Sequence, residues 1–332
     1  MNSSEYNKYY VIKPTDNVTL NNNAIFSNTY ENMYDLYNIE DKLFIYASKL
    51  DSEILEMLKH YNHIIFSDRF NGNIDNLPNN IMSITFDYES DFNHPINNLP
   101  YGLTFLLLNC YFNQPLDNLP ITLKYLFINN FYLFPLDNLP YGLKYLSITD
   151  YKNPINNLPI TLEELHIFGD ICNTIDNLPD SIKILKINGE FNQPINKFPE
   201  SLEKLFLYGQ ISYVFPTLWT TNLKTIDFGY IFNMDLENIG WVNCENIREI
   251  YFGIDFNKKL TESNLPKKLE IIEVRENFNL IENIISLPKT LKKFKINILN
   301  CSLLQVNIQF YYNNIKKLNL QYPNIHFFIN KF

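Results

Sequence analysis

The stretch that decides the fold is Phe112-Asn-Gln-Pro-Leu-Asp-Asn-Leu-Pro120, followed at once by Ile121-Thr-Leu-Lys-Tyr-Leu-Phe-Ile128. The same pattern recurs from Phe70 almost to the end of the chain, with a period close to 20 residues. Leu-Pro pairs and their variants mark the repeats at Pro78, Pro100, Pro120, Pro140, Pro159, Pro179, Pro199, Pro266 and Pro288. A fixed period of this kind indicates a repeat architecture, in which each unit packs only on its neighbours.

A second pattern, Leu-x-x-Leu-x-Leu or a close variant, follows each of these prolines, as in Leu123/Leu126/Ile128. With a period near 20 residues, this spacing is the leucine-rich-repeat signature of one short strand per unit. Alternate strand residues point to opposite faces, so Leu126 and Ile128 are expected in the core while Tyr125 and Phe127 face outward. We therefore predict parallel strands stacked into a curved sheet, with the outward residues on its concave face.

The segment between strands is expected to hold little helix. Proline in Phe-x-x-Pro-Ile/Leu and again in Leu-Pro moves the preceding residue out of the α region. Twenty residues also leave no room for a long helix beside a strand. We predict a leucine-rich-repeat-like solenoid with an extended or turn-based convex side.

The domain organisation follows from where the pattern is present. We predict a polar leader over 1–40 and a cap over 41–69, with a helix near 52–61 after Asp51 and a strand near 64–66. About twelve repeats fill 70–323, degenerate at 211–255 where Trp219 and Trp241 lie. The last repeat strand is expected at Ile315/Leu318/Leu320, and a closing strand over 324–332.

Composition excludes several function classes. The chain has 332 residues and a net charge of −9, which disfavours nucleic acid as a partner because phosphate binding needs clustered Lys and Arg. No apolar run approaches the length of a membrane span, and no secretory signal precedes the repeats. The four cysteines, Cys110, Cys172, Cys244 and Cys301, form no CxxC pair. We expect an intracellular, most simply cytoplasmic, monomer with reduced cysteines.

The string Phe-Asn-x-Pro-Ile/Leu-x-Asn-Leu-Pro resembles the FNIP repeat, found in social amoebae and in the giant viruses that infect amoebae. The best copies lie at 92–100, 112–120 and 191–199, and recognisable copies extend from 70 to about 300. The resemblance implies a leucine-rich-repeat-like fold that serves protein–protein contact; for a virus, the compartment would be the host cytoplasm. Some family members carry an N-terminal F-box for ubiquitin-ligase recruitment, but residues 1–60 show no clear Leu-Pro-led F-box.

The outward strand positions divide by chemistry. An apolar patch over three adjacent units consists of Phe105, Leu107, Tyr125, Phe127 and Tyr145. Exposed aromatic side chains in a concave face suit protein binding, because rigid rings bury much area at little entropic cost. The alternative is that the N-terminal segment folds over the patch. A basic end consists of Lys293, Lys295, Lys316 and Lys317, for which a solvated charged face is the simpler interpretation.

Other candidates for chemistry are weaker. His60 and His63 have helical spacing but no further ligands, so no metal site is predicted. An acidic column of Asp75, Asp117, Asp137 and Asp176 alternates with Asn in other units, which favours turn capping over calcium binding. His166 beside Glu164 lacks a nucleophile and an enclosed pocket.

The sequence thus predicts a scaffold for protein–protein interaction that is not an enzyme and needs no cofactor or metal. Its protein partner would bind on the concave face, with no nucleic acid or membrane involved. The alternative is an F-box-like adaptor that recruits a ubiquitin ligase through residues 1–68 while the solenoid holds the target.

Overall fold

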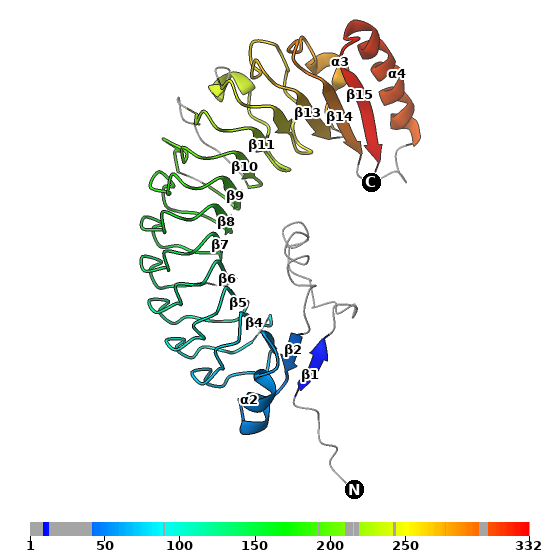
Figure 1. The fold of residues 1–332 in the computed structure, drawn as a ribbon. Helices are drawn as coiled ribbons and strands as arrows, with labels where there is room; N and C mark the ends of the chain where they lie inside the picture. The colour runs from blue at the N-terminus through cyan, green and yellow to red at the C-terminus, as the bar shows by residue number, and fades with distance from the viewer. Residues whose placement is uncertain are drawn as a thin grey trace. The chain divides into compact units, whose positions relative to one another are not determined.

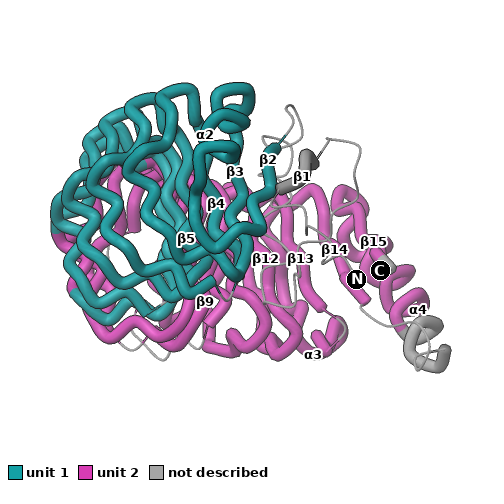
Figure 2. Tube along the Cα trace, turned by 90° about the horizontal axis from the view of Figure 1, so that it is seen from below, with its two compact units in different colours: residues 1–153, 157–162 teal, residues 154–156, 163–332 magenta. Residues whose placement is uncertain are grey.

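The computed structural model describes residues 9–12, 42–88, 90–129, 131–191, 193–209, 215, 219–241, 244–275, 277–298 and 305–331. For 9–12, 305–310 and 331 it describes the backbone alone. The chain forms two compact units, the first built of residues 1–153 with 157–162 and the second of 154–156 with 163–332 (Figure 2). Most of the predicted leader, Cys301 and part of the degenerate stretch lie outside the described residues.

The first unit is a stack of short strands that follow one another in chain order (Figure 1). They are β1 (Tyr9–Ile12), β2 (Lys42–Ile45), β3 (His63–Phe66), β4 (Ser83–Phe86), β5 (Phe105–Leu108), β6 (Tyr125–Ile128) and β7 (Tyr145–Thr149). Strands β2 to β7 are parallel, whereas β1 pairs antiparallel with β2. Strand β1 falls within the span of the predicted leader, where no strand was expected.

The second unit continues the same construction. Its strands are β8 (Glu164–Phe168), β9 (Ile184–Asn188), β10 (Lys204–Leu207), β11 (Thr225–Asp227), β12 (Glu249–Tyr251), β13 (Ile271–Arg275), β14 (Lys293–Ile298) and β15 (His326–Lys331). All neighbouring pairs among them are parallel. In each unit taken by itself, the strands lie side by side along one face and the turns lie on the opposite face (Figure 1). The predicted leucine-rich-repeat-like solenoid is confirmed.

Register follows the leucine pattern. Leu106, Leu126 and Leu146 are direct partners on β5, β6 and β7, and each is fully buried. A shift of one residue would turn these side chains outward, so burial of the leucines fixes the pairing. The outward positions are therefore also aligned, and form a strand face whose side chains stack from one rung to the next.

Helices are few, as expected. A short helix, α2 (Ser52–Leu58), precedes β3, and its N-cap Asp51 accepts a hydrogen bond from the amide of Ile54 at 3.0 Å. A single 3-10 turn, η1 (Leu236–Asn238), and the four-residue α3 (Leu280–Asn283) interrupt the turn side of the second unit.

One expectation was wrong: Ile315/Leu318/Leu320 do not form a repeat strand. They lie in α4 (Gln305–Gln321), the longest helix among the described residues. Tyr311, Ile315 and Leu318 are buried at helical spacing, whereas Leu320 is 85% exposed. The i, i+3 part of the leucine pattern fits a helix face equally well. No Leu-Pro turn precedes this segment to exclude a helix.

The phenylalanines of the repeat form an aromatic column behind the strands. Phe66 stacks on Phe70 and Phe86 on Phe92, each pair with ring centroids 4.0 Å apart. Phe92 in turn stacks on the fully buried Phe112 of the next repeat. In the second unit a similar column consists of Phe228, Phe232, Phe252, Phe256 and Phe278. The most recognisable part of the motif therefore builds core.

The degenerate stretch keeps its core by using larger rings. Trp219 contacts Phe198 with centroids 5.1 Å apart, and both tryptophans are buried. The indole of Trp219 donates to the carbonyl of Ile239 at 2.8 Å, and that of Trp241 to the carbonyl of Asn264 at 2.9 Å. These bonds satisfy donors that burial would otherwise leave unpaired.

The turn side is held by polar ladders between rungs. Asn138 donates to Asp117 at 2.9 Å, and Asn157 donates to Asp137 at 3.0 Å. Asp176 accepts from both the amide and the side chain of Asn196. Asp117 and Asp137 therefore accept from side chains of the next rung and not from turn backbones as predicted, whereas Asp176 does accept from a backbone amide, that of Asn196. Among the described residues no group of three His, Cys, Asp or Glu side chains is placed to hold a metal ion.

Candidate protein-binding surface

The five residues predicted to form an apolar patch do lie together on the strand face of the first unit, on β5, β6 and β7. Ring centroids are 5.2 Å apart for Phe105 and Phe127, and 4.7 Å apart for Phe127 and Tyr145. Tyr125 contacts Phe105 and Tyr145 at 6.4 and 6.3 Å. We call Phe105, Leu107, Tyr125, Phe127 and Tyr145 the aromatic cluster.

Burial of the aromatic cluster is much greater than alternation alone would suggest. Phe127 is only 2% exposed, and Phe105 and Tyr145 are also buried. Leu107 and Tyr125 are partly exposed and pack against these three. The cluster therefore has a closed centre and an accessible rim formed by Leu107 and Tyr125.

The strand face of the second unit has a different character, because charged and polar side chains replace the aromatic ones. His166 lies 2.6 Å from the carboxylate of Glu164 and is almost fully buried. Burial lowers the pKa of His166, and the hydrogen bond to Glu164 opposes this shift. Lys186 extends over the rings of Phe206 and Tyr208, and burial lowers its pKa as well.

Glu273 is a buried acid of this face, and Asp227 is a half-buried one. Asp227 accepts from the hydroxyl of Tyr208 at 3.1 Å and from the amide of Gly229 at 2.9 Å. Glu273 lies between Arg275 and Lys295, at 3.8 and 3.9 Å. Burial raises the pKa of both carboxyls. His166, Lys186, Asp227 and Glu273 each have an internal partner, so these groups of the face are held by contacts within the protein.

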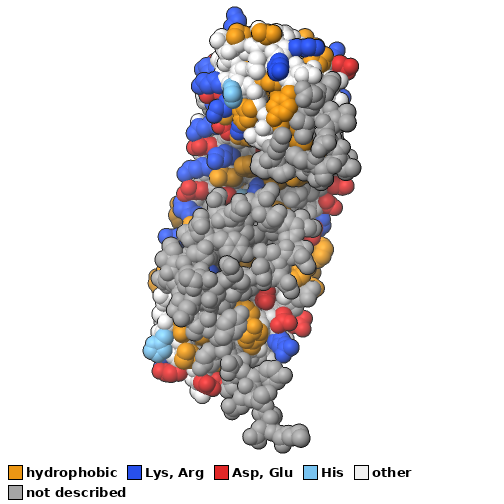
Figure 3. Space-filling view, turned by 90° about the vertical axis from the view of Figure 1, so that its right-hand side faces the viewer, with side chains coloured by type: hydrophobic (Ala, Val, Ile, Leu, Met, Phe, Trp, Pro, Cys, Tyr) orange, Lys and Arg blue, Asp and Glu red, His pale blue; other side chains and the backbone are white. Residues whose placement is uncertain are grey.

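The predicted basic end is divided between a strand and a helix. Lys293 and Lys295 lie on β14, whereas Lys316 and Lys317 lie on α4 because the predicted last repeat is a helix. Lys295 is also paired with Glu273. On the described surface drawn in Figure 3, basic and acidic side chains are interspersed. On that face, the described residues form no continuous basic patch of the kind that binds a phosphate backbone.

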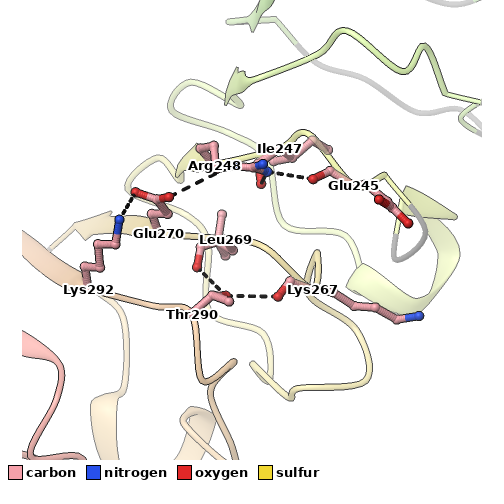
Figure 4. A network of polar contacts seen from close by, with 8 residues as sticks. All are labelled: Glu245, Ile247, Arg248, Lys267, Leu269, Glu270, Thr290 and Lys292. Carbon is pink, nitrogen blue, oxygen red and sulfur yellow. Dashed lines mark hydrogen bonds and ion pairs between the residues drawn. The ribbon is translucent and has the colours of Figure 1, made fainter.

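The edge where each strand of the second unit begins carries ion pairs between rungs. Glu270 pairs with Lys292 at 2.6 Å and with Arg248 at 3.8 Å (Figure 4). On the turn before β14, the hydroxyl of Thr290 donates to the carbonyls of Lys267 and Leu269 (Figure 4). These contacts link successive rungs along this edge. Exposed ion pairs of this kind contribute only about 0–1 kcal/mol each.

The remaining sequence candidates are not brought together into a site. His60 lies exposed after α2, whereas His63 begins β3. Among the described cysteines, Cys110, Cys172 and Cys244 form no disulfide. Residues 42–66 form β2, α2 and β3, and the two strands belong to the same sheet. The ligase-adaptor function stays an alternative prediction, since residues 13–41 lie outside the described part. No helix of the described residues is long and apolar enough to cross a membrane.

Sequence reasoning missed a row of exposed apolar side chains on the turn side of the first unit. Tyr101, Ile121, Tyr141 and Ile160 each follow a proline directly and are 61–71% exposed. The sequence does contain a pattern that predicts this row. The residue after the repeat proline is apolar in these four consecutive repeats and polar in the next two, at Asp180 and Glu200.

The comparisons with known proteins give one family match and two similar solved structures. The FNIP repeat family matches residues 174–209 and 256–297. The solved structure of CroV588, described as a novel circular leucine-rich-repeat protein, is similar with a TM-score of 0.51 and 25% identity over 77% of this chain. The chain spans 47% of that protein's length. YopM from Yersinia enterocolitica is similar over 79% of this chain and 66% of its own, with 19% identity and a TM-score of 0.43. A comparison with curated protein sequences finds no match.

Proposed function

Since this chain is a FNIP-repeat protein built as a leucine-rich-repeat-like solenoid, we propose that it is a non-catalytic scaffold that binds a protein partner on its strand face. The fold class is typical of protein–protein interaction, because stacked rungs present their outward side chains as one continuous surface. Both the protein nature of the partner and its binding site on the strand face belong to the proposal.

The observation that carries the proposal is the aromatic cluster. Three consecutive rungs place two tyrosines, two phenylalanines and a leucine on the strand face. Most of a binding interface's free energy comes from a few residues of this type, packed in a dry centre and surrounded by less important contacts. Phe105, Phe127 and Tyr145 supply a rigid base, and a partner would contact Leu107 and Tyr125 first.

The proposal of a non-catalytic function is supported by the state of the His166–Glu164 pair. His166 is 4% exposed, so a substrate has little access to its ring. Its lowered pKa favours the neutral form, whose Nε2 already lies 2.6 Å from the carboxylate of Glu164. The neighbouring outward residue, Lys186, is itself occupied over two aromatic rings. We also propose an intracellular location, which the absence of disulfides among the described cysteines supports.

The test is affinity capture from an amoebal lysate with three versions of the chain: wild type, a Leu107→Ser/Tyr125→Ser variant, and a Tyr111→Ser control. Tyr111 is 61% exposed but does not belong to the aromatic cluster. The proposal predicts at least one protein that wild type and control retain and the double variant loses. Identical sets of captured proteins for all three chains would refute strand-face binding.

A further inference from the structure

The four exposed side chains Tyr101, Ile121, Tyr141 and Ile160, which we call the turn-tip row, occupy one position of a repeated turn. In each case the amide two residues further on donates to the carbonyl of the preceding proline at 3.0 Å, as Leu123 does to Pro120. The residue after proline is thus at the tip of a tight turn and points away from the core.

The same turn recurs elsewhere with different chemistry at its tip. Nine Leu-Pro-type turns of the described residues are closed by this bond. The other five tips are all polar and exposed: Asn79, Asp180, Glu200, Lys267 and Lys289. The turn therefore has no need of an apolar tip. Four consecutive apolar tips form a contiguous patch of roughly 500 Å², a size that on soluble proteins often marks a binding site.

The turn-tip row is held rigidly by bonds between rungs. The hydroxyl of Thr122 donates to the carbonyls of Tyr101 and Leu103 at 2.6 and 2.8 Å. Thr161 makes the equivalent pair of bonds to Tyr141 and Leu143. A rigid row loses little conformational entropy on binding, which favours a preformed interface.

The spacing of the turn-tip row selects the partner's backbone. Adjacent rungs of a parallel sheet are about 4.8 Å apart, and hydrogen bonds between rungs hold the tips near that spacing. Successive turns of an α-helix are about 5.4 Å apart, whereas same-face residues of an extended strand are about 6.7 Å apart. Over three intervals the side-chain spacing of a helix exceeds that of the row by roughly 2 Å, and the spacing of a strand exceeds it by roughly 6 Å. A helix of about twelve residues places four same-face side chains along the row.

The charges on the two sides of the row favour an ordered partner. Lys124 and Lys144, both exposed, follow Ile121 and Tyr141 at the start of the strands. Asp117 and Asp137, also exposed, precede the same tips. An anionic membrane surface would be repelled by the aspartates and by the net charge of −9. At the outer rungs the equivalent positions are Thr104 and Glu163 on one side and Asn97 and Asn156 on the other. A helix with one acidic and one basic flank therefore matches the two central rungs.

We propose that the turn-tip row is a second protein-binding surface, which takes an amphipathic helix with apolar residues at i, i+4, i+7 and i+11, an acidic flank toward Lys124 and Lys144, and a basic flank toward Asp117 and Asp137. This surface lies on the turn side, and it is independent of the strand-face proposal because no residue is shared.

The experiment selects peptides from two displayed libraries, one of cross-linked 15-residue helices and one of unstructured 15-mers, against the whole chain. Counter-selection uses Ile121→Glu/Tyr141→Asp, which installs the tip residues that the chain itself carries at Glu200 and Asp180. We expect the helical library to yield the pattern above, with at least tenfold weaker binding to the variant at an unchanged melting temperature. Leu107→Ser/Tyr125→Ser should bind the selected helix as wild type does.

Three results would overturn the proposal. One is enrichment from neither library, or from the unstructured library alone. Another is a selected helix that binds the variant as tightly as wild type. The third is a row-dependent dimer in sedimentation, or row-dependent binding to phosphatidylcholine/phosphatidylserine vesicles, without helix selection; these would assign the row to self-association or to a membrane.

Discussion

Replacing Phe112 by Ala should destabilise the first unit, whereas replacing its neighbour Tyr111 by Ala should not. Phe112 is fully buried in the aromatic column and stacks on Phe92 with centroids 6.1 Å apart. Truncation removes the ring's apolar burial and leaves a cavity that neighbouring rings cannot fill without losing their own stacking. Such Phe→Ala changes lower the free energy of unfolding by about 3–5 kcal/mol.

The adjacent control makes this prediction sharp. The side chain of Tyr111 is 61% exposed, and its backbone amide keeps its bond to Ser90 in an alanine variant. A surface change of this kind alters stability by only about 0.5 kcal/mol or less. The two substitutions are at adjacent positions, so the difference between their free energies of unfolding measures the effect of burying the Phe112 ring.

Hydrogen exchange read by mass spectrometry, with thermal unfolding alongside, measures the outcome. Because each rung contacts only its neighbours, the loss of protection in Phe112→Ala should be greatest around β5 and β6 and should decline with distance along the stack. A Phe112→Ala loss below about 1 kcal/mol, or one equal to that of Tyr111→Ala, would refute the reading of the motif phenylalanine as core.

Two further predictions concern backbone approach and pH. Gly142→Ala should lower the free energy of unfolding by about 1–3 kcal/mol, because an added Cβ would lie 2.4 Å from the carbonyl oxygen of Ile121; Gly102→Ala, where the nearest contact is 3.1 Å, should lower it much less, and equal melting temperatures would contradict this. Burial raises the pKa of Asp227, so the stabilisation from its proton is present below the unfolded pKa of about 4 and is lost as the pH rises through the folded pKa. The melting temperature of Asp227→Asn relative to wild type should therefore increase between pH 4 and pH 7, and a difference that is constant or falls would contradict this.

The fold was predictable because the repeat states the same information many times. Apolar residues at the positions of Leu126 and Ile128 recur two residues apart in successive repeats. The proline at the position of Pro120 excludes a helix just before them. Such a repeat therefore carries both a pattern that favours a strand and a proline that prevents a helix. The prediction of a strand at Ile315 and Leu318 was wrong because no such proline precedes them, and the remaining apolar spacing is compatible with a helix face.

The candidate site was only partly predictable. Alternation placed Phe127 on the strand face, but it carries no information on how deeply a side chain is covered, and Phe127 is almost fully buried. Tyr101 and Ile121 were overlooked because sequence reasoning followed the strand positions. Their exposure depends on a turn whose closing hydrogen bond is visible only in three dimensions.

The central claim is that the repeated motif builds the scaffold while variable exposed positions bind the partner. Its most direct test is the dissociation constant of a captured protein for wild type and for Leu107→Ser/Tyr125→Ser, measured with each chain's melting temperature. The account predicts at least tenfold weaker binding, about 1.4 kcal/mol or more, with the melting temperature unchanged. An unchanged dissociation constant, or a loss of affinity that only accompanies unfolding, would contradict it.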